Sequence, residues 1–495
     1  MSNQIDLSRY VSNLDQNVYA IYNLPEEVIA VIFAYVSRSS ASFRENLAKL
    51  LADDELAVGE NAGGLATTYS DKAARFHEKW VVGYGHSSVA EHAVAHIGIE
   101  KISRLASAEL ELANSFNSFT EYSQRYQRPK RGDFYIPEEL KAHPELKACY
   151  ISINEKAYDI YEKLMQGLVQ FLPQKFPQKE NESERAYRSR IEKIAFEDAR
   201  YVLTLATLTN LGLTGNGRAL RDTLVRLLSS SHAESRQLAR AMEKEISQVI
   251  PTLLKYVKPS DYLLKTREAL KQRFKQSELP HHPISGPHAR FISMPAYEEA
   301  LRKLATTLII SQTPLSYEEA NTRTNTYAIF ELEQIAEEAL VHLRFFDNPV
   351  GEFEHLTYQM EMIVSEANWH QLLRHNRRTH FSFGEPTIRL GYTIPPHVEE
   401  AGLGAMFQIL LEQVEQVYHA IASDCPEAAP YLVTNSHHRQ IFATASLWEL
   451  YHLINLRTSP EAQWDIRATF EQLLNELKEK QPIIAKYAQR RVPLT

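Results

Sequence analysis

The sequence predicts an α+β chain built from two related halves, and three observations support this prediction. Apolar residues recur at helical spacing over long stretches, such as residues 146–172 and 460–487, with charged residues between them. Short β-branched and aromatic stretches interrupt the helical pattern. Similar landmarks occur in the same order in both halves. We therefore expect strands and long amphipathic helices in each half.

The repeated landmarks are short, and their value as evidence is in their common order. Five of them occur in register although the two halves share little overall identity. The pairs are Glu91-His92 with Glu354-His355, Ser103 with Ser365, residues 118–119 with 381–383, residues 135–137 with 393–395, and residues 231–236 with 459–467. Chance is a poor explanation for five ordered pairs, so we interpret the chain as a tandem duplication.

The length of 495 residues is sufficient for two domains with full hydrophobic cores. Proline, glycine and histidine gather in residues 258–295, a composition that breaks helices and strands and suits a connector. We place the first domain at residues 1–257, the linker at 258–295 and the second domain at 296–495. The polar, proline-punctuated stretch at about 174–192 is interpreted as an insertion or exposed loop of the first domain.

Charge and cysteine content narrow the class of protein. A net charge of −8 gives no global attraction for a polyanion, so we expect neither a nucleic acid polymer nor a membrane as partner. The cysteines, Cys149 and Cys425, fit a reducing compartment and leave no disulfide framework. The N-terminus lacks the features of a signal peptide, and the longest apolar run, residues 28–36, is too short for a bilayer. We expect a cytoplasmic protein.

Arginine clusters supply the candidate binding chemistry. Residues 371–378 (QLLRHNRR) place three guanidinium groups and one imidazole close together, as recognition of a phosphate or carboxylate requires. Ser123 and Arg125 stand two residues apart, so on an extended segment both point to one side and can hold one phosphate. The alternative interpretation of each cluster is a solvated basic surface or loop.

Two further patterns carry less chemistry. His92 and His96 would share one helix face near His86 and Glu91, but the H-E-x-x-H order is absent, so we expect no metal and interpret these residues as satisfied histidines or cofactor contacts. Residues 212–218 (GLTGNGR) fit neither the dinucleotide fingerprint nor the Walker sequence and alone indicate a turn. The residues by themselves thus predict arginine-lined anion sites without naming a reaction.

Several motifs taken together are shared with a known family. In the first half they are residues 85–92 (GHSSVAEH), 103–104 (SR), 118–126 (SFTEYSQRY) and 135–137 (YIP). In the second half they are residues 353–355 (FEH), 370–375 (HQLLRH), 450–457 (LYHLINLR) and 462–467 (AQWDIR). These motifs resemble the flavin-dependent thymidylate synthases (ThyX). The resemblance implies two tandem ThyX-like domains of the α+β class, each a mostly antiparallel sheet flanked by long helices.

The hallmark of that family is an Arg-His-Arg triplet followed after seven residues by Ser-x-Arg, and neither half carries it whole. The first half keeps Ser123 and Arg125 but has residues 113–115 (Ala-Asn-Ser) in place of the triplet. The second half keeps Arg-His in residues 374–376 (Arg-His-Asn) but has residues 384–386 (Gly-Glu-Pro) in place of Ser-x-Arg. Because the losses are complementary, we expect one composite site that takes residues from both halves.

The resemblance also implies roles for individual residues. The expected nucleotide-binding residues are Ser123, Arg125, Glu121, Arg200, Gln371, Arg374 and Arg457, of which Arg457, Arg374 and Ser123 are also the catalytic candidates. The expected FAD-binding residues are His86, Glu91, Asn216, Arg218 and His375. The second half has Pro430, Ser446 and Trp448 where the first has Arg200, Asn216 and Arg218, whereas the first half has Leu227 where the second has Arg457. In the family, sites lie between subunits of a tetramer, so we expect a homodimer of this chain that forms a pseudo-tetramer.

The activity implied by the resemblance is the reductive methylation of dUMP at C5. Methylenetetrahydrofolate would donate the methylene group, reduced FAD the hydride, and NADPH would regenerate the flavin. Arginines would hold the phosphate and stabilise negative charge on the uracil ring. Two alternatives stay open: a flavin-dependent methylase of another pyrimidine nucleotide, and a decayed, non-catalytic paralogue that binds flavin or nucleotide.

Overall fold

The structure is a computed structural model that describes residues 6–36, 41–51, 87–274 and 288–491. The chain forms two compact units, each built from two segments of the sequence. Unit 1 comprises Met1–Tyr122 and Leu208–Leu279, and unit 2 comprises Ser123–Thr207 and Pro280–Thr495. The segment Ser123–Thr207, which belongs to the predicted first half, therefore packs with the second half. No helix among the described residues is long and apolar enough to cross a membrane.

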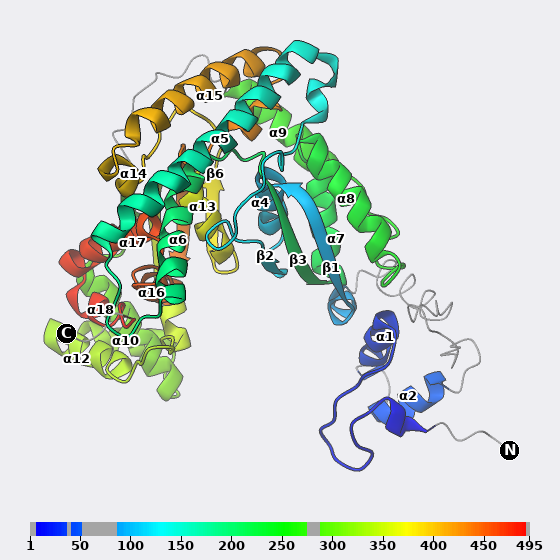
Figure 1. The fold of residues 1–495 in the computed structure, drawn as a ribbon. Helices are drawn as coiled ribbons and strands as arrows, with labels where there is room; N and C mark the ends of the chain where they lie inside the picture. Colours follow the sequence, from blue (N-terminus) through cyan, green and yellow to red (C-terminus); the bar gives the residue numbers. More distant parts are fainter. Residues whose placement is uncertain (1–5, 37–40, 52–86, 275–287, 492–495) are drawn as a thin grey trace. The chain divides into compact units, whose positions relative to one another are not determined.

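Unit 1 is built on a three-stranded antiparallel sheet with the strand order β1-β3-β2 (Figure 1). Its strands are β1 (Val94–Ser103), β2 (Ser118–Glu121) and β3 (Leu208–Asn216). Its helices are η1 (Leu7–Arg9), α1 (Glu26–Val36), α2 (Phe43–Leu51), η3 (Ser87–His92), α4 (Arg104–Ala113), α7 (Gly217–Leu228), α8 (Ala233–Ile246) and α9 (Asp261–Arg273).

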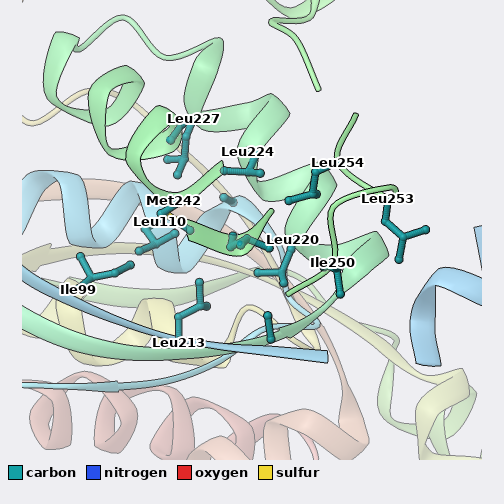
Figure 2. Close-up of a cluster of buried hydrophobic side chains, with 14 of the residues drawn as sticks. Ile99, Leu110, Leu213, Leu220, Leu224, Leu227, Met242, Ile250, Leu253 and Leu254 are labelled. Carbon is teal, nitrogen blue, oxygen red and sulfur yellow. The ribbon is translucent and has the colours of Figure 1, made fainter. Parts of the chain in front are cut away.

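The core of unit 1 lies between this sheet and helices α4, α7 and α8 (Figure 2). Helix α7 contributes Leu220, Leu224 and Leu227, whose spacing of four and three residues forms one apolar stripe. Ile99 and Leu213 supply the sheet side of the same cluster. All five side chains are less than a tenth exposed, so burial of apolar surface stabilises the packing of α7 on the sheet.

Unit 2 is built on a four-stranded antiparallel sheet with the order β4-β5-β7-β6. Its strands are β4 (His288–Ser293), β5 (Thr357–Ser365), β6 (Thr379–Phe383) and β7 (His438–Ser446). Its helices are η4 (Glu138–Ala142), α5 (Pro144–Lys175), α6 (Glu184–Ala199), η5 (Arg200–Val202), α10 (Tyr297–Gln312), α11 (Tyr317–Asn325), α12 (Ile329–Leu340), η7 (Gly351–His355), α13 (Glu366–Leu372), η8 (Leu373–His375), α14 (Pro396–Glu400), α15 (Gly404–Asp424), η9 (Ala429–Leu432), α16 (Leu447–Arg457), α17 (Trp464–Lys480) and α18 (Pro482–Lys486). The long helices α5 and α15 pack against each other (Figure 1).

The two halves of the chain repeat one arrangement of strands and helices. The order β1-α4-β2 and then β3-α7-α8 recurs as β5-α13-β6 and then β7-α16-α17. Ser103 and Ser365 are the N-caps of α4 and α13, and each hydroxyl also donates to a buried carboxylate, Glu234 in unit 1 and Asp465 in unit 2. These shared contacts make the two halves comparable position by position.

The predicted helices over residues 146–172 and 460–487 are present, the first as α5 and the second as α17 followed by α18. The stretch expected to break helices and strands, 258–295, contains α9 and β4 instead. Its prolines bracket these elements: Pro259 precedes the α9 N-cap Ser260, where no backbone donor is needed, and Pro295 follows β4. Residues 275–287 of this stretch lie outside the described residues.

The polar stretch at 174–192 is a loop only between α5 and α6. Helix α5 continues to Lys175, and α6 begins at Glu184. Ser183 caps α6 by accepting a hydrogen bond from the backbone N–H of Ala186. Charged residues with helical spacing thus form a solvated helix here, which a composition argument does not distinguish from a loop.

Candidate functional site

Arg457, the last residue of α16, occupies the centre of an arginine cluster in unit 2. Its Nε and Nη2 atoms donate to Nε2 of His375 at 3.0 and 2.7 Å, and Nη2 also donates to the carbonyl of Gln371 at 2.9 Å. Burial and the positive charges of Arg125 and Arg374 lower the pKa of Arg457 to about 10. Within the described residues, no carboxylate pairs with Arg457. The immediate partners of Arg457, an imidazole and a carbonyl, therefore do not neutralise its charge.

Arg125 and Arg200 both donate to Glu197, Arg125 to its carboxylate and Arg200 to its backbone carbonyl. Arg125 Nε donates to Oε1 of Glu197 at 2.6 Å, and Arg200 Nε donates to the Glu197 carbonyl at 3.4 Å. Arg125 Nη2 also reaches the Glu461 carbonyl, just before α17, at 3.2 Å. Ser123 Oγ accepts the backbone N–H of Arg125 at 3.2 Å and so shapes the turn that carries it. Ser123, Arg125 and Arg200 of the first half thus belong to the same unit as Arg457, and Arg125 contacts residues of the second half directly.

Two glutamines line the second-half side of this cluster. Gln371 donates through Nε2 to the Ala367 carbonyl at 3.1 Å, and its buried Oε1 has no hydrogen-bond partner in the described part of the chain. Gln463, the buried N-cap of α17, donates through Nε2 to the Tyr201 hydroxyl at 3.1 Å. The two amides are 3.5 Å apart, measured from Gln371 Nε2 to Gln463 Oε1. An unsatisfied amide oxygen beside an arginine cluster indicates a site for a ligand with both an anionic group and a donor.

A buried polar scaffold fixes the start of α17 beneath these side chains. Tyr201 stacks on Trp464 with ring centroids 5.4 Å apart and donates from its hydroxyl to Asp465 at 2.8 Å. Asp198 accepts the Trp464 indole N–H at 2.8 Å and lies 2.6 Å from Nδ1 of His397. The links of Tyr201 and Asp198 to Trp464 and Asp465 join the start of α17 to the segment around η5, which carries Arg200, and the link to His397 adds α14.

His375 and Glu449 form a buried pair behind Arg457. Because a guanidinium group has only donors, Nε2 of His375 is the acceptor and its ring proton lies on Nδ1. That Nδ1 lies 3.6 Å from Oε1 of Glu449. Burial, with the charges of Arg457 and His452, lowers the pKa of His375 well below its ordinary value, and burial raises the pKa of Glu449 to about 7.

Three of the expected FAD-binding residues form a group within unit 1. Arg218 Nη1 lies 2.6 Å from Oε1 of Glu91, and both side chains are about half exposed. Asn216 caps α7 by accepting the Ala219 N–H at 2.9 Å. His86 lies outside the described residues. His375, the remaining FAD candidate, is the buried partner of Arg457 described above.

Glu121, expected to bind nucleotide, has partners within unit 1. Its carboxylate forms an ion pair with Arg104 and accepts the Ser107 hydroxyl at 2.9 Å. The side chains of Glu121 and Arg104 are only 2% and 6% exposed. The structure therefore shows a buried structural ion pair at this position.

The second half has a different arrangement at the positions of the unit 1 group. Trp448 stands where the first half has Arg218, and Arg378 lies over its ring at 4.0 Å. Arg378 also pairs with Glu354, the counterpart of Glu91. In unit 2 the partner of Glu354 is therefore Arg378, which follows η8, whereas the partner of Glu91 in unit 1 is Arg218 of α7. Trp448 stands at the position of Arg218.

Sequence reasoning did not identify Glu197, Asp198 or Glu449, and it assigned no role to Gln463 and Trp464. A signal for Glu449 was present: it is a lone acidic residue in helix 447–457, which is apolar on nearly all sides. Such a carboxylate is expected to be buried and to have a specific partner. No comparable pattern marks Glu197, which lies in the polar helix α6.

The structure is that of an α+β protein that repeats one arrangement of strands and helices in its two halves and holds an arginine cluster in unit 2. The family model of thymidylate synthase complementing proteins matches residues 21–252 and again 301–483, so the chain belongs to this family, and the ThyX resemblance is confirmed. A UPF0159 protein of Chlamydia muridarum is 26% identical over 481 residues, covering 93% of this chain and 89% of that relative. A flavin-dependent thymidylate synthase of Clostridium tetani is 30% identical over 197 residues, covering 40% of this chain and 75% of the relative. Among solved structures, a UMP/dUMP methylase, PolB from Streptomyces cacaoi bound with 5-Br dUMP, is similar with a TM-score of 0.34 and 15% identity, covering 43% of this chain and 99% of that one.

Proposed function

We propose that this chain is a flavin-dependent thymidylate synthase-like enzyme that reductively methylates dUMP at C5, and that the arginine cluster of unit 2 binds the nucleotide. The observation that supports this most is the state of Arg457, which is half-buried, close to two further arginines and, among the described residues, hydrogen-bonded to a neutral imidazole and a carbonyl. Partly desolvated like charges are costly unless an anion compensates them. A nucleotide phosphate and an electron-rich uracil oxygen supply that compensation.

The side chains around the cluster suit the two ends of dUMP. Arg125 and Arg200, with Ser123 at the turn, would hold the phosphate through charge-assisted hydrogen bonds. Gln371, whose Oε1 lacks a partner in the described residues, would accept the N3–H of uracil. Arg457 and Arg374 would stabilise negative charge on the uracil ring, which makes C5 nucleophilic toward the methylene donor.

The residues in unit 1 fit part of an FAD site. The exposed Glu91–Arg218 pair and Asn216 at the start of α7 offer charged and polar groups for a flavin ring edge or its diphosphate. His375 does not fit this role, because it is buried and its Nε2 accepts from Arg457. Bound FAD, reduced by NADPH, would supply the hydride that turns the methylene from methylenetetrahydrofolate into a methyl group.

We further propose that the enzyme acts in the cytoplasm as a homodimer. The support is the duplication itself, since two chains that each carry the family unit twice provide four units, the number in the tetramer that the resemblance implies. Analytical ultracentrifugation of the full chain tests this: a species of twice the 56.8 kDa chain mass is expected, and a monomer at micromolar concentration contradicts it.

The deciding experiment is tritium release from [5-³H]dUMP by the full-length protein with FAD, NADPH and methylenetetrahydrofolate. Release that needs all three additions supports the proposed reaction. Release only from another labelled pyrimidine nucleotide indicates the alternative methylase. Binding of dUMP or FAD without any release indicates the non-catalytic paralogue. A visible spectrum with and without dUMP, recorded first, shows whether flavin is bound at all.

A further inference from the structure

Glu449, His375 and Arg457 form a buried row, and the hydrogen bonds from Arg457 to His375 require the tautomer of His375 that carries its proton on Nδ1. Arg457 offers donors from Nε and Nη2, so His375 Nε2 must present its lone pair. The ring proton is then on Nδ1, the nitrogen that lies 3.6 Å from the Glu449 carboxylate. A proton on Nε2 would oppose the guanidinium and break both hydrogen bonds. The orientation of Arg457 thus depends on where His375 carries its proton.

Helix α16 places the Glu449 side chain beside His375. It is the third residue of α16, and its backbone N–H is capped by the Ser446 hydroxyl at 3.2 Å. Its side chain is 5% exposed, although a glutamate at this helix position commonly reaches back to the N-cap in solvent. A buried carboxylate is costly, and burial accordingly raises the pKa of Glu449 to about 7.

The first half of the chain provides an internal comparison. Counted from the equivalent N-caps Ser103 and Ser365, Ala113 stands at the position of His375. Counted from Asn216 and Ser446, Ala219 stands at the position of Glu449 and Leu227 at that of Arg457. All three replacements are buried, and Leu227 packs among the core leucines of Figure 2. The first half lacks all three polar residues, as expected if Glu449, His375 and Arg457 act together.

We propose that Glu449 is a positioning residue for Arg457: it fixes the proton of His375 on Nδ1, so that Nε2 holds the Arg457 guanidinium in place for the nucleotide base. This inference rests on the proposed function. The charged and titratable groups that face the row, among the described residues, are Arg378 on the Glu449 side, with its partner Glu354; His452, whose ring lies 5.6 Å from that of His375; and Arg125 and Arg374 on the Arg457 side. Of the two carboxylates here, Glu354 is engaged by Arg378, which leaves Glu449, 3.6 Å from Nδ1, as the partner that we assign to the Nδ1 proton.

A double-mutant cycle on dUMP affinity, measured by calorimetry on the full-length flavin-loaded protein, tests the inference. We expect Glu449→Ala to weaken dUMP binding about tenfold, the scale of one hydrogen bond to a charged group. In the His375→Ala background the same change should cost less than about twofold, because the two act in series. Glu449→Gln keeps an acceptor oxygen for Nδ1–H and should restore most of the affinity.

Two further measurements separate positioning from general damage. Glu415→Ala removes another carboxylate that lies 3.4 Å from a buried histidine, His437, and should leave dUMP affinity unchanged. Nitrogen NMR of ¹⁵N-histidine protein, with His375 assigned from His375→Ala, should show Nδ1–H in the wild type and loss of this preference in Glu449→Ala. Additive mutant effects, or an unchanged tautomer, overturn the inference while dUMP binding persists. Failure of the wild-type protein to bind dUMP overturns the proposed function and this inference with it.

Discussion

Glu449 and His375 are buried side by side, and burial shifts their pKa values in opposite directions. The pKa of Glu449 rises from 4.5 to about 7, so between these values the folded chain holds a proton that the unfolded chain has released. Stability therefore falls as pH rises through this window, by about 3 kcal/mol in total at about 1.4 kcal/mol per unit. The lowered pKa of His375 acts with the opposite sign, since its contribution is lost as pH falls through 6.5.

Replacing Glu449 by glutamine removes only the first of these two effects. We expect the stability of Glu449→Gln relative to the wild type to increase by about 3 kcal/mol between pH 4.5 and pH 8. The contribution of His375 is common to both proteins and largely cancels in the difference. Urea unfolding at several pH values measures this. A difference that does not change with pH would show that Glu449 is not a buried titrating group.

Also at the scale of the residue, we predict which individual arginines of the cluster are required for dUMP binding. Arg125→Ala and Arg374→Ala should each weaken dUMP binding about a hundredfold, because each removes a charge-assisted contact to an anion in a partly buried site. The control is Arg128→Ala, which lies on the same loop but pairs with Glu162 in solvent. Calorimetric titration with dUMP decides the matter, and unchanged affinity in either cluster variant would exclude a composite site.

At the scale of the element, hydrogen bonds at the N-terminus of α17 hold this helix against α13 and η5, next to the arginine cluster. Asp465 accepts hydrogen bonds from Ser365, Tyr201 and Asn368, and so joins α17 to α13 and to η5. Glu234 makes the corresponding bond to Ser103 in unit 1. The same capping device thus appears in both halves, but in unit 2 it also supports Gln463 and Trp464.

Asp465→Asn should therefore affect both stability and binding. We expect a loss of about 1–3 kcal/mol, the cost of weakening buried charge-assisted hydrogen bonds, together with weaker dUMP binding. The matched variant Glu234→Gln should lower stability by a similar amount without changing dUMP affinity. Denaturant unfolding and calorimetry on both variants provide the comparison. Equal effects on affinity would show that α17 has no special role.

Elements and contacts differ in how well the sequence predicts them. The helices over residues 146–172 and 460–487 follow from their periodicity, because one apolar face must be buried. Helix α9 and strand β4 do not, because the signal there was proline content, and proline at the edges of an element resembles proline inside a connector. The complementary motif losses led to the expectation that Arg125, Arg374 and Arg457 meet. The role of Glu449 depends on a tertiary contact with His375, which no local pattern encodes.

For the whole molecule, the comparison of the halves predicts how many nucleotides one chain binds. In unit 1, Leu227 stands where unit 2 has Arg457, and Glu109 stands where unit 2 has Gln371, six residues after the equivalent serine caps. Burial raises the pKa of Glu109, but the hydrogen bond and charge of His232 more than reverse this, with Nδ1 of His232 2.8 Å from the carboxylate. Unit 1 thus has a carboxylate paired with His232 and an apolar side chain where unit 2 has an amide and a guanidinium.

These two positions of unit 1 offer a nucleotide neither the guanidinium nor the amide of unit 2, so each chain should bind one dUMP although it carries the family unit twice. Calorimetry with the flavin-loaded protein should give one site per chain. Arg457→Leu, which copies the residue of the first half, should reduce that number to zero at the concentrations where the wild type saturates. A stoichiometry of two would mean that Glu109 and Leu227 do not block binding, and that anion recognition in this chain does not depend on the arginine cluster of unit 2.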